Sequence, residues 1–161
     1  MPRLPRLSAA LLSVAAASAG AQTVQKTVSL EVASQVAAHG VAACAAGGHA
    51  VTVAVVDRAG QLKALARADN AGPHSLDSAR RKAYTAASMR NATGAIMENM
   101  QKNPAAANLW QIDGIIGLAG GLPIRIGNEV IGGVGVGGAP GGHLDEQCAV
   151  AALDKVKELL K

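Results

Sequence analysis

Aromatic residues are almost missing from this sequence. Its 161 residues include no Phe, one Tyr and one Trp, although 50% of them are hydrophobic. A folded core must therefore be built from Ala, Val, Leu and Ile side chains and from backbone. Elements in such a core must approach one another closely, which the 19 glycines permit because glycine has no Cβ. The length suits one domain around one core.

Apolar runs long enough to cross a membrane are also missing. The run at residues 11–17 is too short to span a bilayer. It follows Arg3 and Arg6 and precedes Ala19-Gly20-Ala21, so this start has the basic, apolar and small-residue parts of a secretory signal peptide. We expect cleavage after Ala21, which makes residues 1–21 a signal peptide and the mature protein periplasmic or secreted.

Strong charge of one sign is missing too. The formal net charge is +4, and loss of Arg3 and Arg6 leaves the mature domain, residues 22–161, at +2. So mild a charge does not favour a nucleic-acid partner. The chain also lacks a Ser-His-Asp order, paired catalytic carboxylates and zinc-ligand spacing, so the sequence gives no support to classical hydrolase activity.

Cysteine occurs only twice, as Cys44 and Cys148. In an oxidising compartment, two cysteines indicate a disulfide. The alternative is that both are small buried hydrophobic residues. The sequence leaves both interpretations open.

The remaining pattern predicts an α+β fold. Period-2 and β-branched segments alternate with longer segments of helical periodicity, and tight turns join neighbouring strands, which implies antiparallel pairing. Strands grouped between helices favour an α+β sandwich over alternating βαβ units. Helices are expected at residues 28–46, 75–89, 93–101 and 144–160, and strands at residues 51–57, 61–67, 115–118, 122–126 and 130–136.

The stretch GGVGVGG at residues 132–138 contains the spacing of a dinucleotide-binding fingerprint. That fingerprint belongs in the turn between a strand and its helix, whereas these glycines lie within a strand. Gly133, Gly135 and Gly137 alternate, so they leave one face of the strand without side chains. Such a bare face accepts either a tightly packed helix or a flat ligand.

Several segments together resemble the GlcG/HbpS heme-binding family, which also includes the C-terminal domain of PduO-type proteins. The resemblance covers about residues 27–160, and Gly137 stands where this family usually has Ser. The matching segments are Val53-Ala54-Val55-Val56-Asp57 with Gly60, Arg67-Ala68-Asp69, Ser78-Ala79-Arg80-Arg81-Lys82-Ala83-Tyr84-Thr85-Ala86-Ala87, Arg90 to Thr93, Gly120-Gly121-Leu122-Pro123-Ile124, Gly132 to Gly138, and Asp145-Glu146-Gln147-Cys148-Ala149. The resemblance implies a five-stranded antiparallel sheet packed with about four helices, assembly into dimers or larger oligomers, and heme binding or heme-linked redox sensing.

A heme site needs an axial ligand, an apolar slot and cations for the propionates. Of the four histidines, His74 is the best candidate for the iron ligand, because it stands just before a predicted helix. Residues in line with it at helical spacing are Ser78, Arg81 or Lys82, and Thr85. The alternative is a solvated basic helix face.

Other residues have simpler structural explanations. Tyr84 is a possible ligand or stacking partner, although a lone Tyr on a helix is more often a core residue. His39, His49 and His143 are assigned to packing, to a glycine turn and to the start of the last helix.

The sequence thus favours an exported, oligomeric heme carrier or heme-linked sensor without a membrane span. A heme-degrading enzyme is the second hypothesis. A non-heme accessory protein that binds a small organic acid is the third, because heme pockets often contain stacked aromatic residues and this chain has few.

Overall fold

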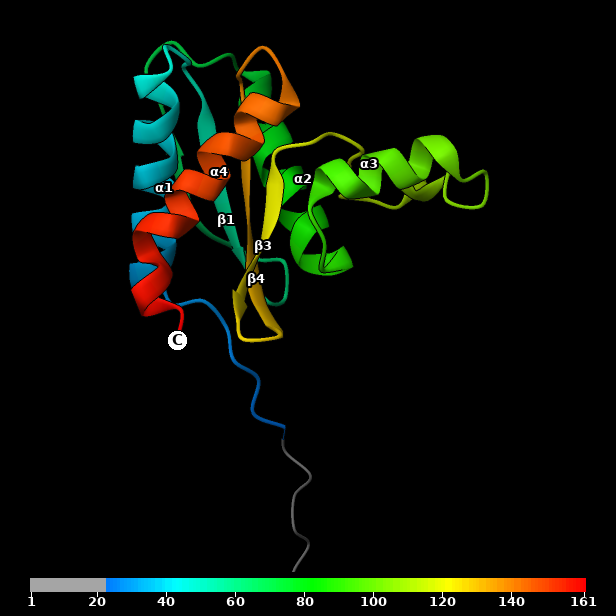
Figure 1. The fold of residues 1–161 in the computed structure, drawn as a ribbon, viewed down its shortest axis with the longest axis horizontal. Helices are drawn as coiled ribbons and strands as arrows, with labels where there is room; N and C mark the ends of the chain where they lie inside the picture. Colours follow the sequence, from blue (N-terminus) through cyan, green and yellow to red (C-terminus); the bar gives the residue numbers. More distant parts are fainter. Residues whose placement is uncertain (1–22) are drawn as a thin grey trace, which may run out of the picture.

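The computed structural model describes residues 23–161, so the expected signal peptide lies outside the described residues. The fold has three layers, with a central sheet between two helices on one face and one helix on the other (Figure 1). The helices are α1 (Leu30–Ala46), α2 (His74–Met89), α3 (Thr93–Lys102) and α4 (Gly142–Val156), with short 3-10 helices η1 (Leu109–Gln111) and η2 (Lys157–Leu159); the strands are β1 (Thr52–Asp57), β2 (Leu62–Arg67), β3 (Gly121–Ile126) and β4 (Glu129–Gly137).

The sheet is antiparallel throughout, with the order β2-β1-β4-β3. The α+β class, the four α-helices and the antiparallel pairing are confirmed for residues 23–161, but the expectation of five strands is wrong. Residues 115–118 are not a strand, because side chains of α2 satisfy their backbone groups. The amide of Ile116 donates to Thr85 Oγ1 at 3.0 Å, and the carbonyl of Ile115 accepts from Arg81 Nη2 at 2.6 Å.

Helix α2 covers the glycine-rich face of β4. A Cβ placed on Gly135 would overlap the backbone of Ala79 and Ala83, and one on Gly133 would overlap the carbonyl oxygen of Ala83. The bare face of the strand therefore receives a helix and not a flat ligand. Glycine is required here because the two backbones are in direct contact.

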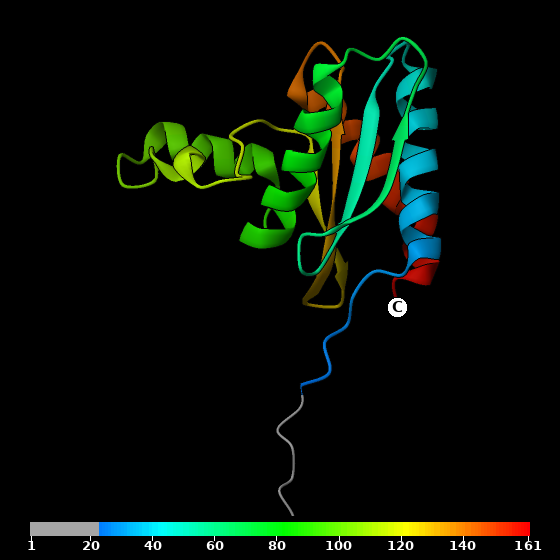
Figure 2. The same ribbon diagram turned by 180° about the vertical axis from the view of Figure 1, so that it is seen from behind.

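The larger core lies on the opposite face of the sheet, where α1 and α4 pack side by side (Figure 2). It consists of aliphatic and alanine side chains, among them Val36, Val53, Val134 and Ala149, all fully buried. A disulfide joins Cys44 of α1 to Cys148 of α4, with 5.4 Å between their Cα atoms. The disulfide interpretation of the two cysteines is therefore confirmed.

Residues 93–119, here called the arm, project from the sandwich (Figures 1 and 2). The arm comprises α3, η1 and the loop that returns to β3, and it carries the exposed side chains of Trp110, Ile112 and Leu118. No helix in the described part of the chain has both the length and the apolar character needed to cross a membrane.

Candidate functional site

A cavity of about 960 Å³ lies where the N-terminal ends of α2, α3 and α4 come together. Its volume falls within the range of small-molecule binding sites. The walls combine small and apolar residues with a few polar groups. They comprise His74, Ser78 and Lys82 of α2; Ala92, Gly94, Ala95, Met97, Glu98, Leu118 and Ala119 from the arm and its approach; and Gly138 to Gln147, apart from Leu144, with Val150, Ala151 and Asp154.

Two histidines line this cavity from different helices. His74 is the first residue of α2, and His143 lies in the first turn of α4. Both residues are exposed, and neither imidazole has a hydrogen-bonding partner among residues 23–161. Both imidazoles are therefore free to bind a ligand that enters the cavity.

The stripe of α2 that faces the cavity follows a spacing of four residues. It brings together His74, Ser78 and Lys82, as expected for one face of a helix. A Cβ on Gly137 would overlap the hydroxyl oxygen of Ser78. The hydroxyl of Ser78 thus fills the space that a side chain at position 137 would need.

The ammonium group of Lys82 is paired at the floor of the cavity. Its Nζ lies 2.7 Å from Asp145 Oδ2 and donates to the carbonyl oxygen of Val136 at 2.8 Å. Each side chain of the ion pair is only 4% exposed. The other oxygen of Asp145 accepts a hydrogen bond from the amide of Ala139 at 3.1 Å.

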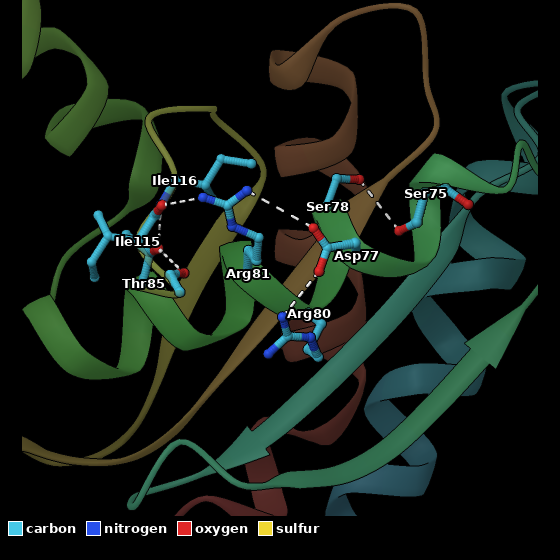
Figure 3. A network of polar contacts seen from close by, with 9 residues as sticks. Ser75, Asp77, Ser78, Arg80, Arg81, Thr85, Ile115 and Ile116 are labelled. Atoms are coloured by element: carbon cyan, nitrogen blue, oxygen red, sulfur yellow. Dashed lines mark hydrogen bonds and ion pairs between the residues drawn. The ribbon is translucent and has the colours of Figure 1, made fainter. Parts of the chain in front are cut away.

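Three other predicted site residues lie outside the cavity lining. The side chain of Arg81 donates to the carbonyl of Ile115, and the hydroxyl of Thr85 accepts from the amide of Ile116 (Figure 3). Tyr84 packs between two glycines, since a Cβ on Gly60 would lie 2.7 Å from its ring and one on Gly114 would lie 3.0 Å away. The structure therefore separates Arg81, Thr85 and Tyr84 from His74, Ser78 and Lys82.

Sequence reasoning missed the contribution of α4 to this site. His143 is assigned above only to the start of the last helix, and Asp145 appears there only within a segment that resembles the family. The pair Gly141-Gly142 before His143 was a usable signal, because small residues at a helix start leave its end accessible. The partnership of Lys82 with Asp145 joins residues 63 positions apart and left no local signal.

The donor set and the walls fit an iron porphyrin better than a free metal ion. Among residues 23–161, no group of three or more His, Cys, Asp or Glu is arranged to hold a metal ion. A heme iron needs only one or two ligands from the protein, since the porphyrin supplies the rest, and an imidazole is a common one. Met97, Leu118 and Val150 supply apolar wall. Lys82 and Arg81, the cations expected for the propionates, already have acceptors within the protein.

The molecule is thus a three-layer α+β domain with a histidine-lined cavity at the starts of its helices. The chain belongs to the HbpS-like family, since the family model described as "Haem degrading protein HbpS-like" matches residues 28–154. This confirms the resemblance found in the sequence.

Solved structures agree with this assignment. A double mutant of HbpS from Streptomyces reticuli is 39% identical, with a TM-score of 0.81 over 91% of this chain and 98% of that one. Protein ORFY of Klebsiella pneumoniae is 32% identical, with a TM-score of 0.79 over 83% of this chain and 93% of that one. The PduOC:heme complex, at 23% identity and a TM-score of 0.71 over 80% of this chain and 94% of that one, shares the fold.

A curated relative is similar in sequence. An uncharacterized 15.0 kDa protein in the dhaT-dhaS intergenic region of Citrobacter freundii is 35% identical over 111 residues, which is 68% of this chain and 78% of that protein.

Proposed function

We propose that this protein binds heme in the cavity between α2, α3 and α4, with His74 as the iron ligand. The observation that carries the proposal is the convergence of two histidines, His74 and His143, on one cavity with apolar walls. Membership of the HbpS-like family and the fold shared with the PduOC:heme complex support it. We further propose that the protein is exported and acts as an oligomeric carrier or heme-linked sensor.

Each part of the cavity has a defined task in this proposal. Bound heme would supply a redox-active iron and a flat apolar surface. The imidazole of His74 would hold the iron, while Met97, Leu118 and Val150 would exclude water from the ring. Lys82 would not be the cation that pairs with the propionates, because its ammonium is already bound to Asp145.

A hemin titration of the mature protein tests this proposal. We expect a saturable shift of the Soret band with a stoichiometry of one heme per chain. A spectrum identical to that of free hemin would overturn the proposal and leave the non-heme interpretation, a small organic acid in the same cavity, as the alternative.

A heme-degrading activity is the second candidate, and the description of the matched family as haem degrading favours it. It requires dioxygen as the oxidant, an external reductant, and an iron coordination position that the protein leaves open. Addition of ascorbate to the hemin complex distinguishes the two functions. Progressive loss of the Soret band with release of iron identifies an enzyme, whereas a stable band identifies a carrier or sensor.

A further inference from the structure

The buried ion pair between Lys82 and Asp145 lies at the floor of the cavity and ties three separate segments together. Lys82 belongs to α2, its second acceptor is the carbonyl of Val136 near the end of β4, and Asp145 belongs to the first turn of α4. The amide of Ala139 completes the set by donating to Asp145 Oδ1. The Lys82 ammonium, the two Asp145 carboxylate oxygens, the Val136 carbonyl and the Ala139 amide thus all have partners within the protein.

These contacts fix the segment that links β4 to α4. Residues 138–142 form one side of the cavity and lead directly into His143. The hydrogen bond from Ala139 to Asp145 closes this segment into a ring, and Lys82 anchors the ring to α2. The position of His143 therefore depends on contacts made at the cavity floor.

The backbone of Gly120 packs directly against this ion pair. Gly120 has φ +116°, and a Cβ at that position would lie 2.6 Å from the Cβ of Asp145 and 3.0 Å from Nζ of Lys82. A glycine in this conformation is thus needed for the ion pair to be buried.

Stability alone does not account for such a pair. Transfer of two charges out of water costs about as much as their attraction returns, and an apolar pair of similar volume is often equally stable or more so. An ion pair adds directional hydrogen bonds, and these define one relative position for the segments that it joins.

We propose that Lys82 and Asp145 are positioning residues that hold residues 138–143 in the shape the cavity needs, so that ligand binding depends on a pair that need not touch the ligand. This inference rests on the proposed function for its binding assay, but its structural claim is tested without heme.

The decisive variant replaces both charges at once, as Lys82→Met with Asp145→Leu. No unpaired charge is left buried, so the fold is expected to persist with a wild-type circular dichroism spectrum. Hemin affinity should fall about tenfold, because the cavity wall formed by residues 138–142 loses its fixed shape and must be ordered when the ligand binds. Hydrogen exchange at the Ala139 amide should become faster, while exchange in β1 stays unchanged.

A matched control removes the other long-range ion pair, Arg58–Glu129, which is partly exposed and lies outside the cavity lining. Arg58→Met with Glu129→Leu should leave both hemin affinity and Ala139 exchange at wild-type values. If the Lys82/Asp145 double variant is unfolded, Lys82→Met with Asp145→Asn replaces it, because this variant also leaves no buried charge and Asn keeps an acceptor for the Ala139 amide. Lower hemin affinity and faster Ala139 exchange in this variant report the lost anchor to α2 and not a lost acceptor.

The outcomes separate the two proposals. A folded double variant with wild-type hemin affinity and wild-type protection of Ala139 would show that the pair only stabilises the fold, and would overturn the inference. If the wild-type protein itself does not bind hemin, the proposed function fails. Hydrogen exchange at the Ala139 amide then decides the positioning role by itself. Faster exchange in the Lys82/Asp145 variant than in the wild type supports this role, and an unchanged rate rejects it.

Discussion

Cys44 and Cys148 are joined across 104 residues of sequence, with 5.4 Å between their Cα atoms. The bond connects the C-terminal part of α1 to the first half of α4, on the face of the sheet opposite α2. Both residues are nearly inaccessible to solvent. The disulfide thus links the two helices that cover the larger core.

Removal of this disulfide should destabilise the protein strongly. In the chain-entropy model a loop of this length contributes about 4–5 kcal/mol by restricting the unfolded chain. Cys44→Ala with Cys148→Ala should therefore lower the free energy of unfolding by several kcal/mol in urea titrations. The wild-type protein measured with a reductant should behave like the variant. A difference below about 1 kcal/mol would contradict the structural role, because a typical disulfide contributes about 2–4 kcal/mol.

Gly135 should tolerate no side chain. A Cβ there would overlap the backbone of Ala79 and Ala83, and a backbone cannot move aside as a flexible side chain can. Gly135→Ala should cost about 1–3 kcal/mol or more, as overpacking of a core does, and thermal unfolding followed by circular dichroism would measure it. Gly47→Ala is the matched control, since its Cβ would come no closer than 3.4 Å to its neighbours. Equal melting temperatures for the two variants would refute the tight contact of α2 with β4.

His74→Ala should abolish the shifted Soret band of the hemin complex, because the proposed iron ligand is lost. The fold should be unaffected, since the His74 side chain is exposed. His143→Ala should leave the band in place, and His39→Ala, on α1 and outside the cavity lining, is the neutral control. If the His143 variant loses the band and the His74 variant keeps it, the ligand is His143.

Export should leave an N-terminus at or near Gln22. The basic start, the short apolar run and Ala19-Gly20-Ala21 have the pattern that signal peptidases cleave. Mass spectrometry of the protein recovered from the periplasm or medium would measure this. A soluble cytoplasmic protein that still carries Met1 would disprove export.

The helices and strands with clear periodicity were predictable from the sequence, because local patterns determine them. The start of α2 and the hairpin of β1 and β2 follow from patterns within a few residues, whereas the glycine-rich strand allowed either a packed helix or a flat ligand on its bare face. The segment at Ile115 and Ile116 looked like a strand, yet its backbone bonds to Thr85 and Arg81 instead of to a neighbouring strand. The sequence of a β-branched segment does not show whether its backbone will bond to a neighbouring strand or to side chains.

The candidate site was predictable only in part. Helical spacing placed His74, Ser78 and one basic residue on a common stripe, but it allowed both Arg81 and Lys82. In the structure Lys82 lies at the cavity floor, because the carboxylate of Asp145 accepts from it there. Arg81 reaches the loop instead, because the carbonyl of Ile115 accepts from it. Both partners are distant in sequence, so only the tertiary fold could decide between them.

Trp110, the one tryptophan of the chain, is 59% exposed and lies on the projecting arm. Its fluorescence emission therefore reports on the arm and not on the packing of the sheet against α1, α2 and α4. An unfolding curve recorded by tryptophan emission will follow the solvation of this exposed indole, while far-ultraviolet circular dichroism follows the loss of the sandwich itself. Midpoints from the two signals should differ whenever the arm detaches before the sheet melts.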